Sequence, residues 1–163
     1  MRDPWSKIIA RESLADELAQ PPGVRVVLAN GLFDVLHVGH ARYLAAARAA
    51  GDRLVVALND DASARANRGI QRPLIPLAER MLLIAGLACV DWVTWFPETT
   101  VAATLSLLRP ACHAKGTDYR PSTLPAEEQA VHHALGIAVV SVGDEKTHAT
   151  SDIVKTVLAR YSA

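Results

Sequence analysis

The segment from Ala29 to Arg48 places two histidines where a short loop enters a predicted helix. His37 and His40 stand three residues apart, so they share one face of a helix and can reach one anion together. Gly39 removes a side chain that would crowd such a ligand, and a helix N-terminus favours an anion at the same place. Imidazoles that donate hydrogen bonds to phosphate oxygens stabilise a charged transition state, so the segment predicts phosphoryl-transfer chemistry.

The same histidine pair is compatible with a structural role or with zinc ligation. Zinc requires further ligands, and the remaining four histidines do not group with the pair or with a cysteine in the sequence. The loop also lacks the Walker lysine and the glycine triplet of the dinucleotide-binding fingerprint, so neither of those phosphate sites is predicted.

Arginines gather in the polar segment that follows the second predicted strand. Segment 59–75 contains Arg65, Arg68 and Arg72, and Arg80 lies one turn into the next predicted helix. Because arginine pairs with phosphate through two parallel hydrogen bonds, these side chains suit a polyphosphate substrate. A solvated basic face of the protein would have the same composition.

Two more segments carry groups that suit phosphate. Lys115 closes a predicted strand, and Gly116 after it allows close approach of the backbone; the alternative is a surface lysine in a turn. Thr150 and Ser151 stand where the last predicted helix begins, as candidates for its N-cap. Their hydroxyls and the N–H groups of that helix would form a second phosphate cradle.

Strands alternate with helices along the whole chain. The predicted strands are 24–29, 53–58, 91–96, 111–115 and 137–142, and the predicted helices are 38–50, 76–88, 100–108, 126–135 and 151–161. This order predicts an α/β fold with a Rossmann-like, doubly wound parallel sheet of about five strands and helices on both faces. We expect one domain over 1–163, in which 1–23 form an N-terminal helical extension.

Ligands of such sheets bind beyond the carboxyl ends of the strands. The polar segments 30–40, 59–75, 115–125 and 143–151 should therefore meet at one edge of the sheet. All four of the candidate phosphate-binding groups fall within or beside these segments, so one shared site is predicted.

Composition narrows the functional classes. Half of the residues are hydrophobic and the formal net charge is zero, so disorder is not indicated and the basic excess typical of nucleic-acid binding is absent. No uncharged apolar run reaches the ~18 residues of a membrane span, and the N-terminus lacks an apolar signal core. We expect a cytoplasmic protein that binds neither nucleic acid nor membrane, with Cys89 and Cys112 as buried reduced thiols.

The first loop also resembles a known signature. NGLFDVLHVGH is similar to the HxGH motif of the nucleotidyltransferase superfamily, which includes cytidylyltransferases, pantetheine-phosphate adenylyltransferase and class I tRNA synthetases. ATSDIV resembles the serine/threonine-rich motif of cytidylyltransferases. Two further segments, RPLIPLAERMLLIAGLACVDWV and KGTDY, extend the resemblance over residues 5–160. Over this length the sequence resembles the D-glycero-β-D-manno-heptose 1-phosphate adenylyltransferases of ADP-heptose biosynthesis, a route to lipopolysaccharide. The resemblance is to their stand-alone form.

The resemblance implies a role for each group. His37, His40 and Lys115 are the predicted catalytic residues, which stabilise the phosphates of ATP, and Asp34 is expected to orient a histidine or accept from the substrate. The predicted ligands of the sugar phosphate are Arg72 and Arg80. The predicted nucleotide-binding residues are Asn30, Gly31, Leu32, Phe33, Asp34, Gly39, Asn59, Arg65, Arg68, Gly116, Asp118, Tyr119, Thr147, Thr150 and Ser151.

The same resemblance implies substrates and partners. ATP and heptose 1-phosphate would be the substrates, Mg²⁺ would be held by substrate phosphates rather than by a side chain, and the protein would form a homodimer or a larger homo-oligomer. Three alternatives stay open: a cytidylyltransferase for glycerol 3-phosphate or a similar alcohol phosphate, a non-catalytic nucleotide-binding module, and a tRNA synthetase fragment. No anticodon-binding region and no basic excess support the last.

Overall fold

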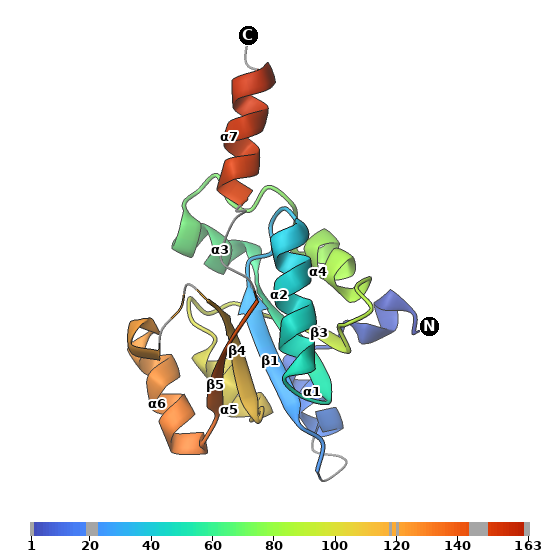
Figure 1. Ribbon diagram of the computed structural model, residues 1–163, viewed down its shortest axis with the longest axis vertical. Coiled ribbons are helices and arrows are strands. Elements are labelled where there is room, and N and C mark those ends of the chain that lie inside the picture. The colour runs from blue at the N-terminus through green and yellow to red at the C-terminus, as the bar shows by residue number, and fades with distance from the viewer. Residues whose placement is uncertain (1, 19–22, 118, 120, 144–149, 162–163) are drawn as a thin grey trace.

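The computed structural model describes residues 2–18, 23–117, 119, 121–143 and 150–161. Its centre is one sheet of five parallel strands in the order β3-β2-β1-β4-β5 (Figure 1). The strands are β1 (Val26–Gly31), β2 (Arg53–Asn59), β3 (Trp92–Phe96), β4 (Cys112–Gly116) and β5 (Ala138–Val142). The Rossmann-like α/β fold expected from the alternation of strands and helices is confirmed, because each pair of neighbouring strands runs in the same direction.

Helices flank the sheet, and the last one, α7, projects away from it (Figure 1). They are α1 (Arg11–Leu18), α2 (Val38–Ala49), α3 (Asp61–Arg68), α4 (Leu77–Ala85), α5 (Ala102–Leu108), α6 (Ala126–Leu135) and α7 (Thr150–Tyr161), with 3-10 turns at Pro4–Lys7 and Pro121–Thr123. No helix among the described residues is both long and apolar enough to cross a membrane.

The alternation of side chains along the strands divides the core into two layers. Val27 and Ala29 of β1 pack in the layer that includes Leu44 of α2 and Ile84 of α4. Leu28 of β1 belongs to the other layer, which Leu14 of α1, with Leu105 and Leu108 of α5, completes. Both faces of the sheet are therefore covered, and the polar groups of the site are left to the edge where the strands end.

Two local predictions need correction. Segment 59–75 was expected to be a loop, but it contains helix α3. The N-cap of this helix is Asp60, whose side chain accepts a hydrogen bond from the N–H of Ser63. Thr150 is the first residue of α7, so neither it nor Ser151 is the N-cap of that helix. The expectation that both cysteines are buried thiols holds for Cys112, whereas Cys89, which is also free, is only partly buried.

Candidate functional site

A cleft of about 750 Å³ lies at the carboxyl edge of the sheet, where the four polar segments meet. The predicted site residues that line it are Asn30, Gly31, Leu32, Phe33, Asp34, His37, Gly39, His40, Asn59, Arg68, Arg72, Lys115, Gly116, Tyr119, Thr150 and Ser151. Each of the four segments contributes to this lining. The expectation that parallel strands bring these segments together at one edge is therefore met by the geometry.

Two predicted residues in the described part of the chain do not line the cleft, and two more lie outside that part. Arg65 lies exposed on α3 and takes no part in the cleft, and Arg80 is completely buried. Asp118 and Thr147 lie outside the described residues. The assignment of Arg80 to a sugar phosphate does not fit its burial, since a ligand in the cleft cannot reach a guanidinium with no exposed surface.

The histidine pair sits at the N-terminus of α2. The rings of His37 and His40 stack with their centroids 3.8 Å apart. The rings of Phe33 and His40 make a T-shaped contact with their centroids 5.2 Å apart. His37 is the N-cap, and its Nδ1 accepts from the N–H of Gly39 at 3.1 Å. In neutral His37 the hydrogen is therefore on Nε2, the nitrogen that can donate to an anion.

The backbone between β1 and α2 is constrained where it carries this pair. Phe33 has a φ of 49°, in the left-handed region that residues with a side chain seldom adopt. A Cβ on Gly31 would lie 3.1 Å from the ring of Phe33. Glycine at position 31 thus leaves room for the Phe33 ring, which in turn supports His40.

Lys115 enters the cleft from the end of β4 and is largely buried. Its ammonium donates to Oδ1 of Asn30 at 3.0 Å and forms an ion pair with Glu128 of α6 at 3.1 Å. Burial lowers the pKa of Lys115, and the neighbouring carboxylate opposes that shift. A partly desolvated cation in a cleft is suited to hold phosphate oxygens.

Asp34 lies beneath the segment that follows α3. It is buried, and its carboxylate accepts from the N–H groups of Leu74 and Ile75 at 2.7 and 3.0 Å and pairs with Arg72 at 2.6 Å. These contacts engage both of its oxygens, so the expectation that Asp34 orients a histidine is not what the geometry shows. It fixes the 72–75 segment and the position of Arg72 at the rim.

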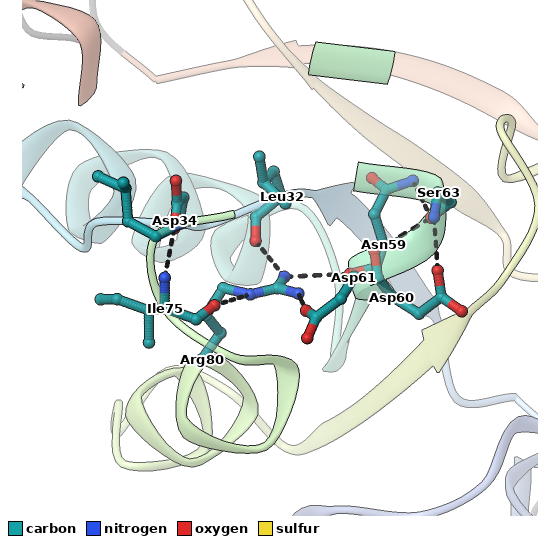
Figure 2. A network of polar contacts seen from close by, with 9 residues as sticks. Leu32, Asp34, Asn59, Asp60, Asp61, Ser63, Ile75 and Arg80 are labelled. Carbon is teal, nitrogen blue, oxygen red and sulfur yellow. Dashed lines mark hydrogen bonds and ion pairs between the residues drawn. The ribbon is translucent and has the colours of Figure 1, made fainter. Parts of the chain in front are cut away.

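Arg80 ties together the strand ends that form the floor of the cleft (Figure 2). Its guanidinium donates to the carbonyl oxygens of Leu32, Asn59 and Ile75 at 2.7, 3.0 and 2.9 Å. It also pairs with Asp61 of α3 at 2.6 Å. Arg80 therefore holds the ends of β1 and β2 and the start of α3 in register, which is a scaffolding role.

Several residues of the lining were not predicted from the sequence. They are Arg42, Tyr43, Ala64, Asn67, Thr99, Thr117, Pro125, Glu128, Val142 and Gly143. A signal was present for Glu128, because Glu128, Val131 and His132 have the spacing of one helical stripe, and that stripe is the buried face of α6. Two polar residues on a stripe that faces the core indicate a polar network beneath them.

The comparison with protein families identifies the fold more closely. A model described as cytidylyltransferase-like matches residues 28–158, which include every part of the cleft. The chain belongs to the cytidylyltransferase-like family. This is a family of nucleotidyltransferases, so the enzyme class and the superfamily indicated by the HVGH segment are confirmed.

Curated relatives and a solved structure extend this result. The chain is 41% identical over 158 residues to the bifunctional protein HldE of Syntrophotalea carbinolica, covering 96% of this chain and 32% of that protein. HldE of Pelobacter propionicus is 42% identical over 162 residues, which cover 98% and 33%. The chain thus spans about a third of the length of these relatives.

Among solved structures, a lipopolysaccharide core biosynthesis protein from Thermoplasma volcanium is 33% identical with a TM-score of 0.62. The alignment covers 75% of this chain and 100% of that one. A second solved structure, a pantoate-beta-alanine (pantothenate synthetase) protein from Thermus thermophilus, is 16% identical with a TM-score of 0.57. The alignment covers 94% of this chain and 72% of that one, and at this identity it shows a shared fold alone.

Proposed function

We propose that the protein transfers AMP from ATP to D-glycero-β-D-manno-heptose 1-phosphate, giving ADP-heptose and pyrophosphate. The observation that carries this proposal is the convergence of the stacked histidine pair at the N-terminus of α2 with Lys115 in one cleft. Support for the sugar comes from the likeness to HldE and to a lipopolysaccharide core biosynthesis protein. The same likeness supports a role in lipopolysaccharide precursor synthesis, and we propose that the protein acts in the cytoplasm.

In this reaction an oxygen of the sugar phosphate attacks the α-phosphorus in line. The bond from that phosphorus to the bridging oxygen of the β-phosphate breaks, and pyrophosphate leaves with the electron pair. His37 and His40 donate hydrogen bonds to oxygens of the α- and β-phosphates, and Lys115 holds the α-phosphate. Catalysis is then a matter of positioning and charge stabilisation, so no covalent intermediate with the protein is required.

Side chains at the rim of the cleft complete the substrate contacts. Thr150 and Ser151 line the cleft at the start of α7 and would bind the β- and γ-phosphates. Arg68 supplies an exposed cation beside the triphosphate, and Arg72 faces the sugar phosphate while it stays paired with Asp34. Arg65 and Arg80 have no direct part in this scheme because neither lines the cleft.

We propose that Mg²⁺ binds together with the nucleotide. Among the described residues of the lining, the carboxylates are Asp34 and Glu128, and each is already paired, with Arg72 and with Lys115. Oxygens of the triphosphate are the hard ligands that this ion prefers. When bound, Mg²⁺ supplies positive charge that offsets the phosphates.

A pyrophosphate-release assay tests the proposal. The purified protein is given heptose 1-phosphate or glycerol 3-phosphate with each of the four nucleoside triphosphates and Mg²⁺. We expect release with ATP and the heptose phosphate. Release with CTP and glycerol 3-phosphate instead would identify the alternative cytidylyltransferase, and ATP binding without any release would identify a non-catalytic module.

A further inference from the structure

A pair of buried histidines lies behind Lys115, between the sheet and α6. His113 of β4 has no exposed surface, and its Nδ1 lies 2.8 Å from Nε2 of His132, which is itself buried. Its Nε2 lies 2.9 Å from Oδ1 of Asn30. Burial of polar rings is costly unless they are hydrogen-bonded, and the proposed reaction gives neither histidine a part. The contacts of this pair therefore point to a role beside the catalytic lysine.

The directions of the hydrogen bonds follow from the chemistry of the groups. The ammonium of Lys115 has only donors, so the atom of Asn30 that faces it must be the amide oxygen. The same oxygen faces Nε2 of His113, so that nitrogen must carry a hydrogen. In a neutral ring Nδ1 is then an acceptor, and Nε2 of His132 is the donor to it.

We propose that His113 is a positioning residue for Lys115 and acts through the amide of Asn30; this inference rests on the proposed function of Lys115. The N–H of His113 holds the amide so that its oxygen faces the ammonium. His132 maintains the required tautomer of His113 from α6. Without that N–H, the amide is free to rotate and to present its NH₂ group to Lys115, which repels the cation.

The surroundings of Lys115 define what this positioning controls. Glu128 pairs with it from α6 and Asn30 contacts it from β1. His113 lies two residues before it on β4, and His132 of α6 contacts His113 and lies near enough to Lys115 to feel its charge. The ring of Tyr119 lies 5.4 Å from its ammonium. If Asn30 turns, Glu128 and this ring remain as the groups that favour the charged form, against the burial that disfavours it.

His113 itself stays neutral over the working range of pH. Burial, with Lys115 and His132 nearby, lowers the pKa of His113 to about 2. The ring is therefore neutral at the pH at which Lys115 would act, and its contacts with Asn30 and His132 select the tautomer that donates to Asn30. A fixed neutral donor in this position keeps the ammonium in one place without adding a competing positive charge.

A matched pair of variants tests the proposal. In His113→Gln the amide nitrogen can reach the place of Nε2 and still donate to Asn30. In His113→Asn the shorter side chain reaches only the place of Nδ1, so the donor to Asn30 is lost. The direct readout is titration of Lys115 by NMR in protein labelled at Cε of lysine, since the chain has four lysines and a Lys115→Arg variant assigns the signal.

We expect His113→Asn to lower the pKa of Lys115 relative to the native protein and His113→Gln to leave it unchanged. In the pyrophosphate assay kcat should fall about tenfold in His113→Asn, as one lost hydrogen bond predicts. The basic limb of the pH–kcat profile of this variant should also move to lower pH. An unchanged Lys115 titration in His113→Asn, or an equal shift in both variants, would overturn the proposal.

Two features keep this experiment decisive. The titration needs no substrate, so it tests the role of His113 even if the protein proves inactive with heptose 1-phosphate. If His113→Asn does not fold, His132→Leu removes the donor to Nδ1 from the α6 side. That variant should also lower the pKa of Lys115, whereas His132→Gln, which keeps a donor, should not; equal titrations in the two would contradict the proposal.

Discussion

The two histidines of the HVGH segment carry different duties although their rings stack. His37 caps α2 through its Nδ1, whereas His40 lies inside the helix and packs against Phe33. The hydrogen bond to the cap fixes the orientation of the His37 ring, and stacking on that ring restricts the orientation of the His40 ring. At the scale of single residues, preorganisation of donors is thus built into the helix start.

His40→Ala is the first prediction at this scale. Because the variant removes a donor that stabilises charge on the phosphates, kcat for pyrophosphate release should fall by about 100- to 1000-fold. The circular dichroism spectrum should stay native, since His40 does not cap the helix. The matched control is His133→Ala, which changes an exposed histidine of α6 away from the cleft. Near-normal turnover by His40→Ala would contradict the assignment of His40 as a catalytic residue.

The second prediction concerns the stability of the buried imidazole at position 113. Its pKa is lowered to about 2 in the folded state, against 6.5 in the unfolded chain. Below pH 6.5 the unfolded chain therefore binds a proton that the folded protein does not, so the free energy of unfolding decreases as the pH is lowered. The loss should reach about 3 kcal/mol by roughly pH 4.5.

Urea denaturation at neutral and acid pH measures this loss. His113→Gln has no imidazole at this position, so its stability should decline less steeply than that of the native protein. His132 titrates in the same direction, because burial lowers its pKa too, and it remains in both proteins. Equal losses in the native protein and the variant would show that His113 is not held neutral by the fold.

Sequence patterns predicted which residue types gather at the site but not what each one touches. Four arginines near segment 59–75 looked equivalent, yet Arg68 and Arg72 line the cleft. Arg65 is exposed, and Arg80 is buried against three carbonyl oxygens. Arg65 and Arg80 lie on α3 and α4, so their exposure depends on which face of each helix packs on the sheet, whereas Arg72 lies between these helices and is held by Asp34. In each case the deciding partners are distant in sequence. Spacing alone does not specify these partners.

At the scale of elements, the strands and most helices were predictable, and α3 was not. The five strands are mostly apolar runs bounded by turn residues, which is the pattern of a buried parallel sheet. In α3, DASARANR is nearly all polar and small, so no apolar stripe marks it as a helix. Its order comes instead from the Asp60 cap and from the contact of Asp61 with Arg80.

The contacts of Arg80 with the ends of β1 and β2 and with α3, here called the Arg80 clamp, give the third prediction. Arg80→Met leaves the carbonyl oxygens of Leu32, Asn59 and Ile75 without their donor and removes the partner of Asp61. Because each of three carbonyl oxygens loses a charged donor, the free energy of unfolding should fall by about 3–5 kcal/mol, with little added by Asp61, whose side chain is 35% exposed. Chemical denaturation measures it.

Arg65→Met is the matched control for that clamp. It makes the same chemical change on an exposed face of α3, so stability should change by less than about 0.5 kcal/mol. A loss in Arg80→Met no larger than in this control would mean that the clamp does not hold the floor of the cleft.

At the scale of the whole molecule, the cleft joins segments from the first, second and fourth strands with the start of the last helix. A ligand that contacts all of them stabilises the folded chain as a unit. ATP with Mg²⁺ at 100 times its dissociation constant should raise the free energy of unfolding by about 2.7 kcal/mol and the melting temperature by about 5–10 °C.

Thermal unfolding with and without nucleotide measures this shift. Lys115→Met should reduce it at the same nucleotide concentration, because one cation is removed from the phosphate site. An equal shift in both proteins would place the nucleotide away from Lys115. The expected homodimer or larger assembly stays a prediction, which sedimentation analysis of the same samples would test.

The cap role of His37 has a consequence for what substitutions position 37 can accept. Asparagine, aspartate and serine are good helix caps, so they can restore the bond to the N–H of Gly39 and return a folded protein. None of them supplies a ring to stack on His40. In a saturation library, selection for expression alone should therefore recover these replacements, and selection for growth that depends on turnover should reject them.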